Sequence, residues 1–72
     1  MHVEHLYVYS VFLPTGARLM QYTSANPPPS LGEIIPLNVH GSFHDFEVLN
    51  IDEKATHQYK SVILKVRPVF RS

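Results

Sequence analysis

The chain has 72 residues, no cysteine, and six basic and six acidic residues, so its formal net charge at pH 7 is zero. This length predicts one small domain over residues 1–72, stabilised by an efficient core or a partner subunit because no disulfide or thiolate–zinc site is available. A hydrophobic fraction of 44% argues against disorder. Without an apolar run of about 18 residues or a basic segment typical of a signal peptide, we expect a cytoplasmic protein with no membrane partner.

The charges are separated along the sequence. All six acidic residues lie within the first 53 residues, and five of the six basic residues follow them. Strand neighbours of opposite charge are common stabilising pairs, so this split is consistent with neutralisation in a folded sheet. The alternative interpretation is a basic face that binds a polyanion.

Residues 2–13 are rich in β-branched and aromatic side chains, which predicts a strand. Apolar residues fall on both of its faces, with Leu6, Val8 and Phe12 on one and Tyr7, Tyr9 and Val11 on the other. A chain this short has little material to cover a second face, so we interpret the face of Tyr7, Tyr9 and Val11 as a candidate contact surface for a partner protein. The alternative is that the tyrosines cover the end of a barrel with their hydroxyls in water.

Pro14 to Gly16 predicts a chain reversal, because proline presets φ at the second position of a turn and glycine tolerates positive φ after it. Residues 18–23 then alternate and should pair with the first strand as a hairpin. Residues 24–30 contain three consecutive prolines, which cannot continue a sheet and favour polyproline II. We interpret this segment as a stiff crossover rather than as a ligand for an SH3 or WW domain, because it has no spaced proline motif with a basic anchor.

The middle of the chain contains a short strand and one ambiguous segment. Pro36 limits the strand at residues 34–37 to a short or edge position, and a turn around Gly41 follows. Residues 43–51 could form a helix with Ser42 and Asp45 as a capping box, but the apolar residues would then surround the whole helix. We favour a strand with a bulge near Leu49.

Residues 52–56 are interpreted as a charged loop, and residues 58–67 as the last strand. Val62, Leu64 and Val66 of that strand are expected to face inward, with Ile63, Lys65 and Arg67 outward and regular pairing ending at Pro68. These elements predict an all-β protein, a small five-stranded SH3-like or OB-like barrel with a proline-rich crossover between strands 2 and 3.

The order of these segments is similar to that of a known group of proteins. The crossover, then Leu31-Gly32-Glu33 with an apolar strand, and the terminal residues 62–68 resemble small phage and bacterial proteins with SH3-like barrels, many of unknown function. The resemblance covers nearly the whole chain but consists of generic residues. It implies a small barrel of phage or mobile-element origin and an accessory or inhibitory role without catalysis.

Histidines are numerous, with five in the chain. His40 and His44 flank Gly41, but a zinc site needs three or four converging ligands. Ser42, His44 and Asp45 are residue types of a catalytic triad, yet neighbours on one strand or turn cannot form its geometry. No glycine-rich phosphate-binding loop is present. The sequence therefore predicts no metal, no cofactor and no catalytic residue, so the protein is not expected to be an enzyme.

Two binding functions follow from the sequence. The first is a non-catalytic interaction module, expected to be a homodimer, that binds a partner protein of unspecified identity through Tyr7, Tyr9 and Val11. The alternative is nucleic-acid binding by the basic C-terminal strand with stacking aromatics. The candidate residues for that alternative are Tyr59, Lys60, Lys65, Arg67, Phe70 and Arg71.

Overall fold

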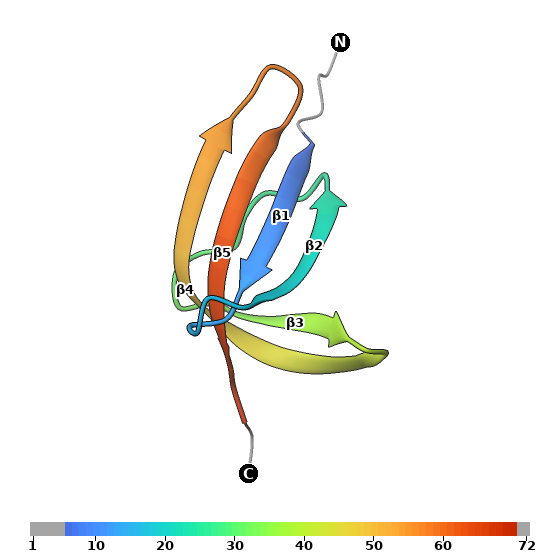
Figure 1. The fold of residues 1–72 in the computed structure, drawn as a ribbon, viewed down its shortest axis with the longest axis vertical. Coiled ribbons are helices and arrows are strands. Elements are labelled where there is room, and N and C mark those ends of the chain that lie inside the picture. Colours follow the sequence, from blue (N-terminus) through green and yellow to red (C-terminus); the bar gives the residue numbers. More distant parts are fainter. Residues whose placement is uncertain (1–5, 71–72) are drawn as a thin grey trace.

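The computed structural model of the chain describes residues 6–70, which form five β-strands and no helix (Figure 1). The strands are β1 (Tyr7–Phe12), β2 (Arg18–Ser24), β3 (Ile34–Val39), β4 (Ser42–Ala55) and β5 (Lys60–Pro68). They form a single sheet in the order β2-β1-β5-β4-β3. The expected all-β class with five strands is confirmed, as is the crossover between β2 and β3.

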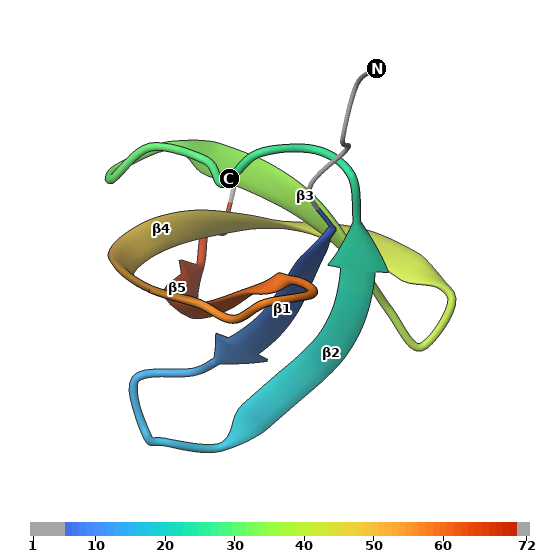
Figure 2. The same cartoon turned by 90° about the horizontal axis from the view of Figure 1, so that it is seen from above.

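The sheet is strongly curled into a half-barrel, as the view from above shows (Figure 2). Antiparallel hairpins join β1 to β2, β3 to β4, and β4 to β5, whereas β1 and β5 run parallel at the centre of the sheet. The long strand β4 pairs with β3 through its first part and with β5 through its second part. Because β4 bends between these parts, the β3–β4 hairpin crosses one end of the sheet (Figure 1).

Two tight turns are found where the sequence predicts them. In the first, the Gly16 amide donates to the Leu13 carbonyl at 2.9 Å, and Gly16 has a φ of 93°. In the second, His40 and Gly41 both have positive φ, at 52° and 88°, which is the backbone of a two-residue hairpin turn that matches the twist of its strands. The Asn38 side chain accepts a hydrogen bond from the Gly41 amide at 3.0 Å. Each turn sets the register of the hairpin that it closes.

A β-bulge at Leu49 keeps β4 in contact with the core on both sides of its bend. The register with β5 shifts between Val48 and Asn50, so Val48 is buried, Leu49 is exposed, and Ile51 packs against the core. This is the bulge that the sequence predicts, and the helical alternative for residues 43–51 is wrong. A bulge adds one residue to one strand and increases the local bend, so it accounts for the change of direction within β4.

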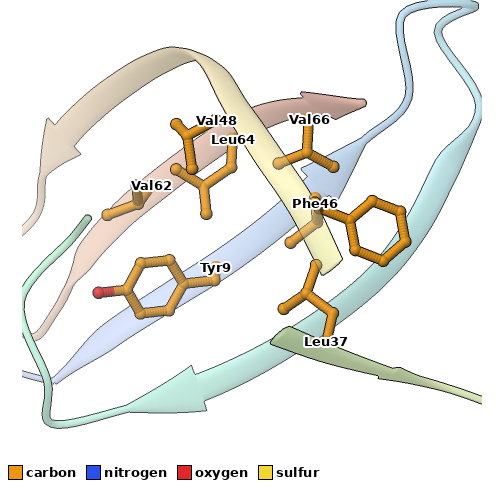
Figure 3. Packing of buried hydrophobic residues seen from close by; sticks show 8 residues of the cluster. Tyr9, Leu37, Phe46, Val48, Val62, Leu64 and Val66 are labelled. Atoms are coloured by element: carbon orange, nitrogen blue, oxygen red, sulfur yellow. The ribbon is translucent and has the colours of Figure 1, made fainter. Parts of the chain in front are cut away.

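The core lies on the concave side of the sheet and is formed by eight buried hydrophobic residues (Figure 3). They are Tyr9, Val11, Leu37, Phe46, Val48, Val62, Leu64 and Val66. The inward direction predicted for Val62, Leu64 and Val66 is confirmed. Leu37 from β3 points toward Phe46 and Tyr9 (Figure 3), so the β3–β4 hairpin covers the concave face.

Some predicted boundaries were wrong. Residues 52–55 belong to β4 rather than to a loop, because each pairs with a residue of β5. The end of the last strand at Pro68 is as predicted, because Pro68, opposite Phe46, is the last paired residue of β5. The first strand is observed as β1, and the part predicted at residues 2–5 lies outside the described residues. Residues 52–55 thus extend the β4–β5 hairpin, although their composition is typical of a loop.

Candidate protein-interaction surface

The two faces of β1 have the opposite roles to those predicted. Tyr9 and Val11 are 2% and 0% exposed and belong to the core, and the half-buried Tyr7 packs against that core. The candidate contact surface of Tyr7, Tyr9 and Val11 is therefore corrected: curvature turns this face inward, where the β3–β4 hairpin covers it. The opposite face of β1 faces outward.

The outward face of the two central strands contains an apolar patch, here called the outer strip, which consists of Leu6, Val8, Phe12 and Ile63. Leu6 is 45% exposed and Ile63 is 46% exposed. Val8 and Phe12 are half-buried but are not among the residues that pack against the core. No segment of residues 6–70 covers this patch, so it is an apolar surface of the described domain that contacts solvent.

The parallel pairing of β1 with β5 assembles the outer strip. Ser10 lies opposite Ile63, so Ile63 sits between the positions of Val8 and Phe12 on the neighbouring strand. The Lys60 amide donates to the Leu6 carbonyl at 2.9 Å and continues the pairing to the start of β1. The patch therefore combines residues from both ends of the sequence.

Polar residues surround the outer strip. Gln21 and Thr23 of β2 lie beside Ser10 and Val8. On the other side, Asp52 of β4 lies opposite Ile63, and Lys65 lies opposite both Phe12 and Asn50. An apolar centre with a polar, charged rim is the arrangement found in protein–protein interfaces.

The three tyrosines of the first hairpin form a stacked row on the concave side. The ring centroids of Tyr7 and Tyr9 are 6.0 Å apart, and those of Tyr9 and Tyr22 are 5.0 Å apart. Burial raises the pKa of Tyr9 to about 12, with smaller contributions from Tyr22, Tyr7 and Glu53. Burial also raises the pKa of Tyr22. Tyr9 and Tyr22 thus remain neutral at physiological pH, and the stacked row stabilises the inner face.

The proline crossover is attached to this row. The Tyr9 hydroxyl donates to the Asn26 carbonyl at 2.5 Å, and Pro28 and Pro29 are half-buried. Further along, the Gly32 amide donates to the Val48 carbonyl, and the Val48 amide donates to the Glu33 carbonyl. The crossover is therefore fixed at both ends.

The residues proposed for nucleic-acid binding do not form one face. Lys60 pairs with Glu53 at 3.7 Å and lies over the Tyr7 ring on the concave side. Arg67 donates from Nε to Glu47 at 2.6 Å on the outer side. Tyr59 and Phe70 lie beyond opposite ends of β5, and Arg71 is outside the described residues. Lys65 lies between these cations, and the acidic strand β4 runs beside β5, so the charge split is largely neutralised in space.

No catalytic or metal geometry accompanies the histidines within residues 6–70. No group of three or more His, Cys, Asp or Glu side chains there could hold a metal ion. His40 occupies the hairpin turn, and Ser42, His44 and Asp45 follow one another along β4. Successive strand residues point to opposite faces, so these three side chains do not converge.

Comparisons with protein-family models, curated proteins and solved structures found no match to this chain. The resemblance to small phage and bacterial barrels therefore stays a prediction. Within residues 6–70, no helix is long and apolar enough to cross a membrane.

The sequence contains part of the signal for the outer strip. It places Ile63 outward and Leu6, Val8 and Phe12 together on one face. It does not show that β1 and β5 are parallel neighbours, because that pairing joins segments at opposite ends of the chain. A long-range pairing of this kind leaves no local mark in the sequence.

Proposed function

We propose that this protein is a non-catalytic interaction module that binds a partner protein through the outer strip. The observation that carries this proposal is an apolar patch on the two central strands that residues 6–70 leave uncovered. Central strands usually have at least one face in the core, but here the second face is apolar too. Contact with another molecule would remove Leu6, Val8, Phe12 and Ile63 from water. This burial stabilises the complex by about 25 cal/mol for each Å² of apolar area.

The rim of the strip supports a second copy of the chain as one partner. Asp52 and Lys65 carry opposite charges and lie on adjacent strands beside Ile63. A twofold interface brings the same patch of two copies together, so a residue away from the axis meets a different residue of the partner, and that contact occurs twice. In such a dimer, Asp52 of each copy can face Lys65 of the other while the apolar centres meet.

The resemblance noted in the sequence adds a cellular role to this proposal. The resemblance implies an accessory or inhibitory role, and binding a partner protein in the cytoplasm without catalysis suits such a role. The outer strip supplies the binding surface that this role requires.

Light scattering at tens of micromolar protein tests the proposal with two matched variants. Ile63→Lys places a charge in the outer strip, and Ile34→Lys places one on β3, where the isoleucine is 45% exposed compared with 46% for Ile63. We expect the parent and Ile34→Lys to scatter as a species of about twice the 8.2 kDa chain mass. Ile63→Lys should scatter as a monomer.

Circular dichroism shows whether both variants remain folded. If the parent is monomeric, the dimer part of the proposal is wrong. Partner binding is then tested by pull-down with the parent and both variants. Capture that Ile63→Lys leaves unchanged would assign binding to another surface and contradict the proposed role of the outer strip.

A further inference from the structure

The half-barrel is open between its two edge strands, β2 and β3. These strands stand at the two ends of the sheet order, and no strand of residues 6–70 pairs with the outer edge of either. Between them lie two adjoining hollows of about 320 and 370 Å³, which share Tyr22, Pro36 and Leu37. We call this opening the seam groove. It lies away from the outer strip, because its lining residues on β2, Met20, Tyr22 and Ser24, lie opposite Val11, Tyr9 and Tyr7 of the concave side.

The two edges of the seam groove are not equivalent. β3 contains Pro36, which has no amide hydrogen, and proline is one of the devices that protect an exposed edge from pairing. β2 has no proline or glycine, and its single charged residue, Arg18, is at its start. A bulge at Leu19 makes the pairing at the start of β2 irregular, and bulges also protect an edge. Beyond the bulge, residues 20–24 pair regularly with β1, and every second residue there presents its backbone donor and acceptor to the free edge, which suits the addition of an extended peptide.

The lining of the groove determines the side chain that such a peptide would place there. The Tyr22 ring and Pro27 to Pro29 provide apolar rings, and Glu33 is the only carboxylate among the lining residues. The Ser30 amide donates to Glu33 Oε1 at 3.3 Å and orients the carboxylate. A carboxylate has more acceptor sites than this bond uses. A long cationic side chain fits this lining, because its stem packs on rings while its head pairs with a carboxylate.

We propose that the seam groove binds an extended basic segment of a partner protein, which pairs with the free edge of β2 and places an arginine or lysine between Tyr22 and Glu33. Alternate side chains of an added strand fall on the concave side, so every second residue would enter the groove. Pairing through the backbone supplies affinity, and Glu33 selects for positive charge. This site is separate from the outer strip, and it does not require that the protein dimerise.

The test uses two blocked peptides, acetyl-Val-Arg-Val-Arg-Val-amide and its counterpart with glutamate in place of arginine. Each is titrated into the ¹⁵N-labelled protein and followed by NMR. We expect the arginine peptide to shift the amides of residues 19–23 and 33–37 in a saturable way. The glutamate peptide should leave these amides unchanged, and methylating the backbone nitrogens of the arginine peptide should abolish binding because pairing with β2 is then blocked.

Two variants separate the groove from general charge attraction. Glu33→Gln keeps a side-chain oxygen for the Ser30 amide and should weaken binding about tenfold. Asp52→Asn removes a carboxylate from the outer face and should bind as the parent does, as should Ile63→Lys. Equal affinity of the parent and Glu33→Gln, shifts confined to other acidic residues, or no saturable shift at millimolar peptide would overturn the proposal. Ile63→Lys changes only the outer strip, so its effect on dimerisation tests the proposed function, whereas peptide binding by the same variant tests the seam groove. One proposal can therefore fail without the other.

Discussion

The concave and convex faces of β1 and β5 contain similar apolar side chains in very different surroundings. On the concave face, Val11, Val62 and Leu64 have no exposed area, whereas Ile63 on the convex face is 46% exposed. The difference arises because the β3–β4 hairpin folds over one side only. Hydrophobic composition therefore does not decide which face of a strand becomes core; the direction in which the sheet curls does.

The largest expected effect is the difference in stability between substitutions at Leu64 and at Ile63, which are neighbours in the sequence. Leu64→Ala should lower the free energy of unfolding by about 2–5 kcal/mol, because it removes buried methyl groups and leaves a cavity. This loss is comparable to the whole stability of about 3–5 kcal/mol expected for so small a domain. Ile63→Ala should change stability by only about 0.5 kcal/mol. Urea unfolding followed by circular dichroism measures both, and equal losses would contradict the assignment of the faces.

The second test concerns the crossover that borders the concave face. A triple variant with glycine at Pro27, Pro28 and Pro29 has a more flexible unfolded chain. The added entropy should lower the free energy of unfolding by up to about 1 kcal/mol per site. We expect a marked fall in melting temperature, with partner binding weakened only as far as folding is lost. Calorimetry and pull-down at a temperature where the variant is folded separate these effects. A variant that melts like the parent but loses its partner would identify the prolines as a ligand motif.

The third test is the polar contact that attaches this crossover to the concave face. Tyr9→Phe removes the hydrogen bond to the Asn26 carbonyl and should lower the free energy of unfolding by about 1 kcal/mol. The loss is no larger because that carbonyl is on an exposed residue and can bind water instead. Denaturant unfolding at neutral pH measures the loss. An unchanged stability would show that the contact does not contribute.

The same tyrosine predicts a pH dependence. Folding raises the pKa of Tyr9 to about 12, whereas the unfolded chain loses this proton near pH 10. Between these values the unfolded state binds fewer protons, so the contribution of Tyr9 is fully present below about pH 10 and is lost as pH rises toward about 12. Stability measured across this window should fall less steeply for Tyr9→Phe than for the parent.

The smallest effect is expected on the convex side, at the ion pair of Arg67 with Glu47. Both side chains are partly exposed, and surface pairs of this kind contribute about 0.2–1 kcal/mol. A double-mutant cycle with Arg67→Gln and Glu47→Gln at low salt measures the coupling. A coupling energy well above 1 kcal/mol would show that the convex face contributes more to folding than its exposure indicates.

Local patterns in the sequence were sufficient to predict much of the fold. Pro14 and Gly16 predict the first turn because few other residues adopt that backbone, and the alternation of Val62, Leu64 and Val66 predicts the inner face of β5. The bulge at Leu49 follows from the spacing of Val48 and Ile51. These features depend on residues close together in the chain, where φ preferences and strand periodicity act.

The candidate site was less predictable because it depends on curvature and on distant pairing. Alternation shows that β1 has two apolar faces, but it contains no information on which side the β3–β4 hairpin will cover. The seam groove likewise arises because, within residues 6–70, β2 and β3 are the two edges of the sheet and do not pair with each other, which is a property of the whole sheet. Residues 52–55, three of which are charged, have a composition typical of a loop. Their pairing partners in β5, not their own propensities, hold them in the strand.

The central position of β5 has a consequence for how the protein is made. As the chain leaves the ribosome, the β1–β2 and β3–β4 hairpins can form early, but Tyr7 cannot meet Lys60 until the last strand has been synthesised. At about 5–20 residues per second, β5 follows β1 after roughly 3–10 s. During that interval the edge of β1 that pairs with β5 is unpaired, and an unpaired strand edge can pair with another chain, so the nascent chain has an aggregation-prone period. A chaperone, or a partner that binds β1 during translation, would protect the protein in this period.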